Sequence, residues 1–148
     1  MTEHLFDDEF FVYAAAGHRL AKRKRVTIAD LAQERWAMPA HAIMPSAVQW
    51  LRRVLEQHGL PAPRFTLETG SVFLRLKLIA SSGLLTFTSR RPMRQLAPQF
   101  PMVVIPVKEL TWTRHVGVSY RKDAYLSPVA RRFIEILKST ARETGKGS

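Results

Sequence analysis

Residues 36–59 read W-A-M-P-A-H-A-I-M-P-S-A-V-Q-W-L-R-R-V-L-E-Q-H-G, and this stretch decides the predicted fold. Its first three residues form a short apolar strand that Pro39 stops. Ser46 is in position to cap a helix that runs to His58, and Gly59 favours termination there. This segment has one wide apolar stripe and an opposite polar face, which is the pattern of an amphipathic helix.

The same order of strand, loop and helix repeats along the next part of the chain. Residues 64–68 predict a strand, Ser71 caps a second helix to about Ala80, and residues 84–88 predict another strand. This is the βαβ pattern of an open parallel sheet, so the sequence predicts the α/β class with helices flanking a mostly parallel sheet. The continuous apolar run at residues 9–15 predicts a strand buried on both faces, as in a parallel sheet.

The last part of the chain has a different pattern. Residues 102–107 and 114–120 predict two further strands, and Ser127 with Pro128 opens a final helix. The apolar stripe of that helix consists of Val129, Ala130, Phe133, Ile134 and Leu137. The polar tail at residues 140–148 is expected to fray.

Composition limits the class of protein. The 148 residues suit one domain, and the absence of cysteine excludes disulfides, thiolate metal sites and a cysteine nucleophile. No apolar run approaches the ~18 residues of a membrane span, so no membrane association is expected. The acidic N-terminal residues lack the apolar core of a signal peptide, which predicts a cytoplasmic protein.

The net charge is 23 − 12 = +11, which raises the possibility of nucleic-acid binding. The densest basic cluster, residues 22–25, has no neighbouring aromatic side chain, so it is either a solvated loop or a phosphate-binding patch. Between Glu68 and Glu109 there is no acidic residue, although Arg75 lies there with five other basic residues. That stretch is either a basic wall facing an anion or an exposed surface.

Two loops follow the carboxyl ends of predicted neighbouring strands, where open α/β sheets bind ligands. They are residues 39–46 and 69–71, and each leads into a helix N-terminus that suits a carboxylate or a similar anion. Ser46 and Ser71 are either N-caps of their own helices or ligand-binding hydroxyls, and both roles can coexist.

The first of these loops carries a mixed set of side chains. His41, Ile43 and Met44 suit a pocket that is partly apolar and partly polar, or Ile43 and Met44 fold onto the core. The candidate ligand-binding residues are His41, Ile43, Met44, Ser46, Thr69, Gly70 and Ser71.

Catalysis has little support in the sequence. The five histidines are scattered, and no two lie four residues apart on one helix, so no helical zinc pair is encoded. The chain has no Gly-x-Ser-x-Gly motif and no glycine-rich phosphate loop. The sequence therefore predicts a protein without catalytic residues, metal or cofactor.

Several motifs, in order, resemble the effector-binding domain of LysR-type transcriptional regulators. Residues 5–13 read L-F-D-D-E-F-F-V-Y, and residues 26–32 resemble the family's Val-Ser-Leu-x-Asp-Leu-Ala. Residues 78–84 resemble Leu-Val-Ala-Ala-Gly-Leu-Gly, and residues 125–130, followed by Phe133 and Ile134, are similar to the family's C-terminal helix. Each motif is weak alone, whereas their shared order across residues 5–137 is fairly specific.

The resemblance implies a fold like type 2 periplasmic binding proteins, with two lobes around a ligand cleft. Residues 1–118 would form the second lobe, and residues 119–148 the returning end of the first lobe and the tail. The resemblance also implies a small-molecule effector and a homo-oligomer, and the two helix N-termini favour a carboxylate as that effector. It implies contact with DNA only through a helix-turn-helix that is absent from this chain.

The expected function is therefore effector sensing by a LysR-like regulator, with no enzymatic activity. Two alternatives stay open at this point. One is a stand-alone basic module that binds nucleic acid directly. The other is the solute-binding lobe of a transporter, which the missing signal peptide disfavours.

Overall fold

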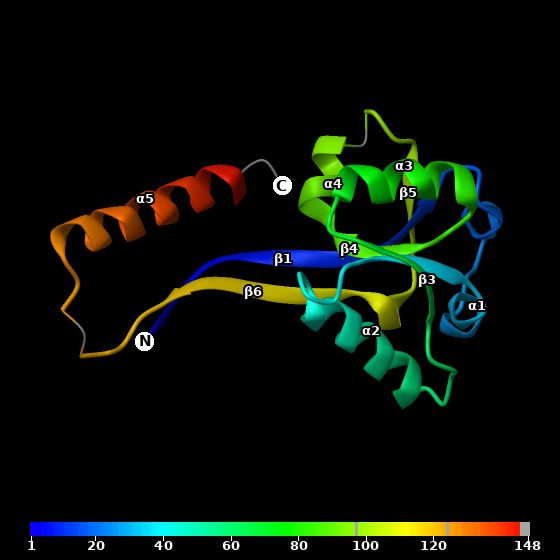
Figure 1. Cartoon of the computed structure of the whole chain (residues 1–148), viewed down its shortest axis with the longest axis horizontal. Coiled ribbons are helices and arrows are strands. Elements are labelled where there is room, and N and C mark those ends of the chain that lie inside the picture. The colour runs from blue at the N-terminus through cyan, green and yellow to red at the C-terminus, as the bar shows by residue number, and fades with distance from the viewer. Residues whose placement is uncertain (97, 124, 146–148) are drawn as a thin grey trace. The chain divides into compact units, whose positions relative to one another are not determined.

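The computed structural model describes residues 1–96, 98–123 and 125–145 (Figure 1). Its strands are β1 (Thr2–Ala15), β2 (Arg35–Pro39), β3 (Arg64–Thr69), β4 (Thr86–Ser89), β5 (Met102–Ile105) and β6 (Trp112–Ser119). Its α-helices are α1 (Ile28–Ala32), α2 (Pro45–Gln57), α3 (Val72–Ser82), α4 (Arg90–Leu96) and α5 (Pro128–Gly145). Two short 3-10 helices, η1 (Arg19–Lys22) and η2 (Lys108–Leu110), complete the set. No helix among the described residues is long and apolar enough to cross a membrane.

The chain divides into two compact units. Unit 1 consists of residues 1–8 and 113–148, and unit 2 consists of residues 9–112. Strands β1 and β6 pair with each other, and each continues from one unit into the other.

Unit 2 has the predicted α/β class, with parallel pairing where the βαβ pattern indicated it. Strands β2 and β3 are parallel, and Trp36 forms a parallel bridge with Leu85, just before β4. Backbone hydrogen bonds from Ala37 N to Leu85 O (2.8 Å) and from Leu85 N to Arg35 O (2.9 Å) join β2 to this segment. The carboxyl ends of β2, β3 and β4 therefore lie at one edge of the sheet.

The prediction for residues 9–15 is correct in burial and wrong in direction. Strand β1 pairs antiparallel with β4 on one side and with β5 on the other. A continuous apolar run reports burial on both faces of a sheet, and this burial is compatible with either strand direction.

The two faces of β1 contribute to two separate hydrophobic clusters. Phe10, Val12 and Ala14 pack in the larger cluster, which includes the buried face of α2. Tyr13 packs in the smaller cluster, to which α3 and α4 contribute. Figure 1 shows α1 and α2 on one side of this sheet and α3 and α4 on the other. The result is a three-layer arrangement with helices on both faces.

In unit 1 the start of β1 pairs with β6, and α5 contributes the helix. Tyr120 N donates a hydrogen bond to Met1 O at 3.0 Å, and Arg114 pairs with the buried Asp8 carboxylate at 2.6 Å. Ser127 accepts a hydrogen bond from Ala130 N at 3.2 Å, as the predicted cap requires. Fraying from residue 140 was the wrong expectation, because α5 continues to Gly145; residues 146–148 lie outside the described part of the chain.

Candidate functional site

The two loops selected from the sequence lie together at the carboxyl edge of β2 and β3. Pro39 is the register partner of Thr69, and Ala40 N donates a hydrogen bond to Thr69 O at 3.2 Å. A Cβ atom added at Gly70 would lie only 2.7 Å from Ile43 Cδ1, so a glycine at this position allows the loops to approach closely. The geometry that the topology predicted is therefore present.

The loop at residues 39–46 is partly folded onto the core and partly exposed, so each of the two alternatives from the sequence applies to part of it. Met44 is partly buried against the larger hydrophobic cluster. His41 is exposed, and Ile43 is 64% exposed with its terminal methyl over Gly70. Only one of the two apolar side chains folds onto the core, which leaves an imidazole and an isoleucine at the surface of the sheet edge.

Ser46 does not cap α2, which corrects the prediction. The helix begins one residue earlier, at Pro45, and the N-cap position belongs to Met44, which forms no side-chain hydrogen bond there. Proline favours the first helical position because its φ angle suits a helix and it has no amide hydrogen to satisfy. The first turn of α2 thus has no side-chain cap from the N-cap residue, and its first backbone N–H groups have no partner within the helix.

Ser71 caps α3 as predicted. Its Oγ accepts a hydrogen bond from Leu74 N at 3.2 Å, and its own N–H donates to Thr69 Oγ1 at 3.2 Å. Both hydroxyl groups therefore stabilise the start of α3. The positive ends of the α2 and α3 dipoles lie at the same edge of the sheet, where they favour a negative charge.

Arg75 adds a residue that the sequence did not select as a site residue. It lies one turn into α3, where its backbone N–H donates to Ser71 O at 3.1 Å. Its side chain is only 2% exposed, with Nη2 at 3.5 Å from Thr88 Oγ1 near the carboxyl end of β4. Its Nε has no hydrogen-bond partner among the described residues.

The charge of Arg75 is not balanced by an acid. The ion pairs of the described residues include none that involves Arg75. Burial lowers the pKa of Arg75 to about 10, which still leaves the guanidinium charged at neutral pH. Removing one partner of a buried ion pair costs about 3–5 kcal/mol of folding free energy, because a buried charge is left without a counter-charge. An anion bound near Arg75 would offset a cost of this kind.

Helix α4, which the sequence analysis did not predict, adds further cations directly after β4. Arg91 N donates to Ser89 Oγ at 3.2 Å, which helps to start the helix. The guanidinium of Arg90 lies 5.8 Å from the Phe11 ring centroid and 3.6 Å from the Glu9 carboxylate. The basic residues of α4, which lie in the segment without acids between Glu68 and Glu109, therefore directly follow the carboxyl end of β4.

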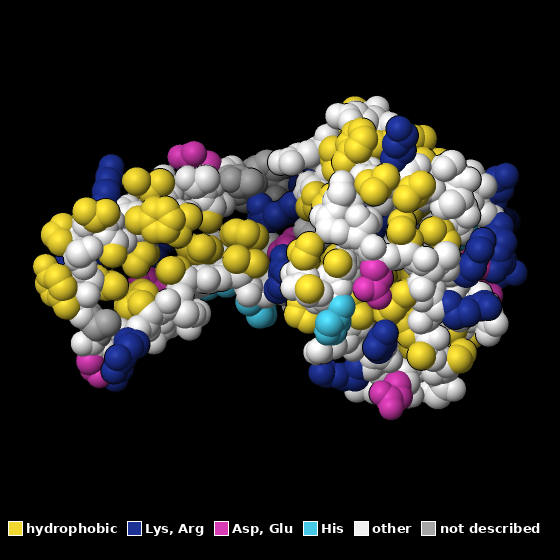
Figure 2. Space-filling view, in the orientation of Figure 1, with side chains coloured by type: hydrophobic (Ala, Val, Ile, Leu, Met, Phe, Trp, Pro, Cys, Tyr) yellow, Lys and Arg dark blue, Asp and Glu magenta, His cyan; other side chains and the backbone are white. Residues whose placement is uncertain are grey.

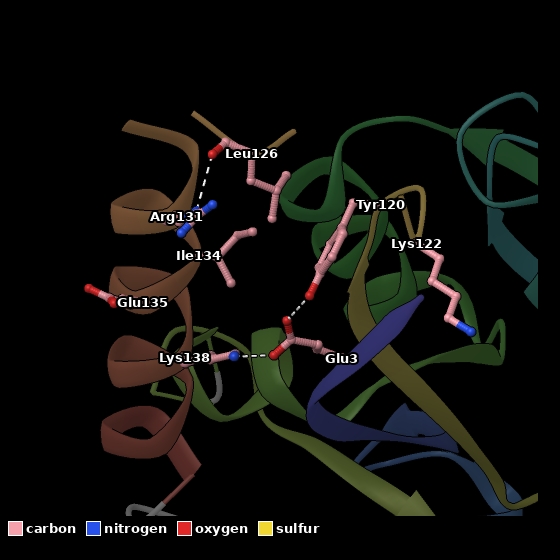
Figure 3. Close-up of a pocket in the computed structure, with 8 residues that line it drawn as sticks. All are labelled: Glu3, Tyr120, Lys122, Leu126, Arg131, Ile134, Glu135 and Lys138. Carbon is pink, nitrogen blue, oxygen red and sulfur yellow. Dashed lines mark hydrogen bonds and ion pairs between the residues drawn. The ribbon is translucent and has the colours of Figure 1, made fainter. Parts of the chain in front are cut away.

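Unit 1 contains a separate pocket of about 350 Å³ (Figure 3). It is lined by Glu3, Tyr120, Lys122, Leu126, Arg131, Ile134, Glu135 and Lys138. Glu3 pairs with Lys138 and accepts a hydrogen bond from Tyr120. Both contacts lower the pKa of Glu3. The hydrogen bond to Glu3 raises the pKa of Tyr120. Glu3, the acid that lines this pocket beside Tyr120, is therefore already paired with Lys138.

Comparison with known proteins identifies relatives. Residues 2–142 match the family model described as the LysR substrate binding domain. A curated relative, the HTH-type transcriptional regulator GbpR of Azospirillum brasilense, is 26% identical over 141 residues, which cover 94% of this chain and 40% of GbpR. The chain therefore spans less than half the length of that relative.

Solved structures share the fold, which is like that of periplasmic binding proteins. The CcmR regulatory domain of Synechocystis PCC6803, solved in complex with 2-PG, has a TM-score of 0.80 at 20% identity; the match covers 95% of this chain and 66% of that one. The effector binding domain of QuiR, solved with shikimate, has a TM-score of 0.73 at 14% identity, with 97% and 66% covered. The fold class predicted from the sequence is confirmed.

Proposed function

The chain belongs to the LysR substrate-binding domain family, and we propose that it senses a small anionic effector for a transcriptional regulator. The effector would bind at the carboxyl edge of β2, β3 and β4. The proposed contacts are the sequence-selected residues His41, Ile43, Met44, Ser46, Thr69, Gly70 and Ser71, together with the field of Arg75. The relatives solved with 2-PG and with shikimate support a small-molecule effector.

The observation that carries this proposal is the unbalanced charge of Arg75, one turn from the N-terminus of α3. In a low-dielectric setting a buried cation attracts an anion more strongly than an exposed lysine does. A neutral ligand gains less from this arrangement than an anion does, so the chemistry favours a carboxylate or another oxyanion.

Effector binding would act by shifting a conformational equilibrium. A ligand shifts such an equilibrium only by its difference in affinity for the two states. We propose that residues 1–118 belong to the second lobe of the effector domain and residues 119–148 to the first, with the effector between lobes.

The proposal includes the setting in which the domain works. DNA would be contacted through a helix-turn-helix outside this chain, as the GbpR relative suggests, and the regulator would act in the cytoplasm without catalysing a reaction. Direct DNA binding by this chain has less support. The cluster at residues 22–25 is exposed, and Arg23 there already pairs with Asp30 at 2.8 Å.

Thermal unfolding in the presence of small ligands tests the proposed function. We expect at least one carboxylate to raise the melting temperature in a concentration-dependent way, because a ligand at 100 times its Kd adds about 2.7 kcal/mol of stability. The matched neutral amide of that carboxylate should give a smaller shift at the same concentration. A folded sample that responds to no carboxylate, phosphate or sulfate at any concentration would contradict the anion proposal.

We also propose that this chain self-associates. Apolar side chains gather over α5 (Figure 2), where Val129 is 79% and Phe133 59% exposed. Exposed apolar groups that lie together commonly mark interaction surfaces. Sedimentation equilibrium should give a mass above that of one chain for the wild type, and a lower mass for Phe133→Glu. Equal monomer masses for both proteins would exclude association through this face.

A further inference from the structure

Three potential metal ligands converge on the exposed side of unit 1. His4 and Asp7 belong to β1, and His115 belongs to the neighbouring strand β6. His4 Nε2 lies 2.7 Å from Asp7 Oδ1, and His115 Nδ1 lies 2.6 Å from the same oxygen. The three ligand atoms all lie within 4.8 Å of one another, so one ion could contact all of them after small side-chain rotations.

An irregularity in β1 brings two of these residues to the same side. Side chains in a regular strand alternate, so residues three apart face opposite sides. In β1 the alternation changes phase, since Leu5 and Phe6 are both partly buried while His4 and Asp7 are both exposed. The phase change accounts for the convergence of an i and i+3 pair, which a search for helical spacing in the sequence does not detect.

The donor set determines the kind of ion. Two imidazoles and one carboxylate suit zinc and related divalent transition metals, whereas magnesium and calcium prefer oxygen ligands alone. Zinc bonds of about 2.0–2.2 Å in tetrahedral geometry put ligand atoms roughly 3.3 Å apart. The histidine–aspartate distances therefore need to open by roughly 0.6 Å.

The surroundings fit an ion with water in its remaining coordination position. A shallow pocket of about 150 Å³ lies beside the two histidines, lined by Thr2, His4, His115, Val116 and Gly117. The Asp7 carboxylate contacts both histidines through the same oxygen, so it lies between the other two ligands.

From this geometry we propose that His4, Asp7 and His115 bind one divalent transition-metal ion, for which zinc is the best match. The bound ion would link β1 to β6 within unit 1. Because the ion binds the folded arrangement, it stabilises this strand pair in proportion to its occupancy. The proposal is independent of the effector site, which uses residues of unit 2.

Isothermal titration of the whole chain with zinc chloride, in a buffer that does not chelate zinc, tests the proposal. We expect one zinc per chain for the wild type. We expect the zinc affinity to fall at least about tenfold in each of three variants, His4→Ala, Asp7→Asn and His115→Ala. Loss of a hydrogen bond to a metal ligand already lowers metal affinity about 10–100-fold, and loss of the ligand itself should cost more. Magnesium chloride at equal concentration should give no saturable heat.

His58→Ala is the matched control, since His58 is an exposed histidine of unit 2 whose Nδ1 contacts Val54 O at 2.8 Å. This variant should bind zinc as the wild type does, and circular dichroism should show that all four variants are folded. Histidine ring resonances in NMR spectra should shift on zinc addition for His4 and His115. Absence of saturable binding by the wild type, or unchanged affinity in folded His115→Ala, would overturn the proposal.

Discussion

Replacing Phe87 with alanine is expected to lower the free energy of unfolding by about 3–5 kcal/mol. Phe87 is fully buried in β4, where its ring stacks on Trp50 of α2 with centroids 5.0 Å apart. On the same side its ring centroid lies 5.6 Å from that of Phe10 in β1. Removal of this ring would leave a cavity between the helix layer and the sheet, and would remove two aromatic contacts.

Urea denaturation followed by circular dichroism measures this effect. Phe87→Leu is the control, because leucine keeps most of the buried volume and should cost much less than alanine. Phe73→Ala in α3 removes a phenylalanine that is more than half exposed and should also cost less. A loss below about 1 kcal/mol for Phe87→Ala would mean that α2 is not held on the sheet by this ring.

Replacing Arg75 with methionine is expected to have two opposite effects. The free energy of unfolding should rise by about 1–4 kcal/mol, because a buried charge is exchanged for an apolar side chain of similar length. The stabilisation by anionic ligands should disappear, because the positive field at the strand edge is lost. A stability gain together with a loss of ligand response is the signature of a residue kept for binding.

Lys77→Met is the matched control for Arg75→Met. Lys77 lies on the same helix and is exposed, so this variant removes the same net charge without changing the buried site. Thermal unfolding with and without the responsive carboxylate compares the two variants. A destabilised Arg75→Met protein that retains the full ligand shift would assign Arg75 a purely structural role.

The ends of a helix could be predicted from the sequence where a neighbouring residue determines them. Gly59 follows α2 with a φ of 67°, as a glycine-terminated helix requires, and Ser71 caps α3. The direction of β1 was not accessible in this way. Its partners β4 and β5 lie about 75 to 90 residues away in the chain, and apolar pattern carries no information on which way a neighbouring strand runs.

The position of the two loops in the candidate site could be predicted from the sequence, whereas the buried charge of Arg75 could not. The loops at residues 39–46 and 69–71 followed from the rule for strand ends, and the structure brings them together. The burial of Arg75 depends on how α3 packs against β4, which sequence spacing does not report. The prediction that Ser46 caps α2 was wrong because proline and serine both favour the start of a helix. Here Pro45 is the first residue of the helix.

The pairing of β1 with β6 has a consequence for the order of folding. Thr2 Oγ1 lies 3.0 Å from Ser119 Oγ, across 117 residues of chain. At about 5–20 residues per second, synthesis of that interval takes roughly 6–23 s. Unit 2 is continuous in sequence, so it can acquire its core, with β1 paired to β4 and β5, while the start of β1 still lacks its partner β6.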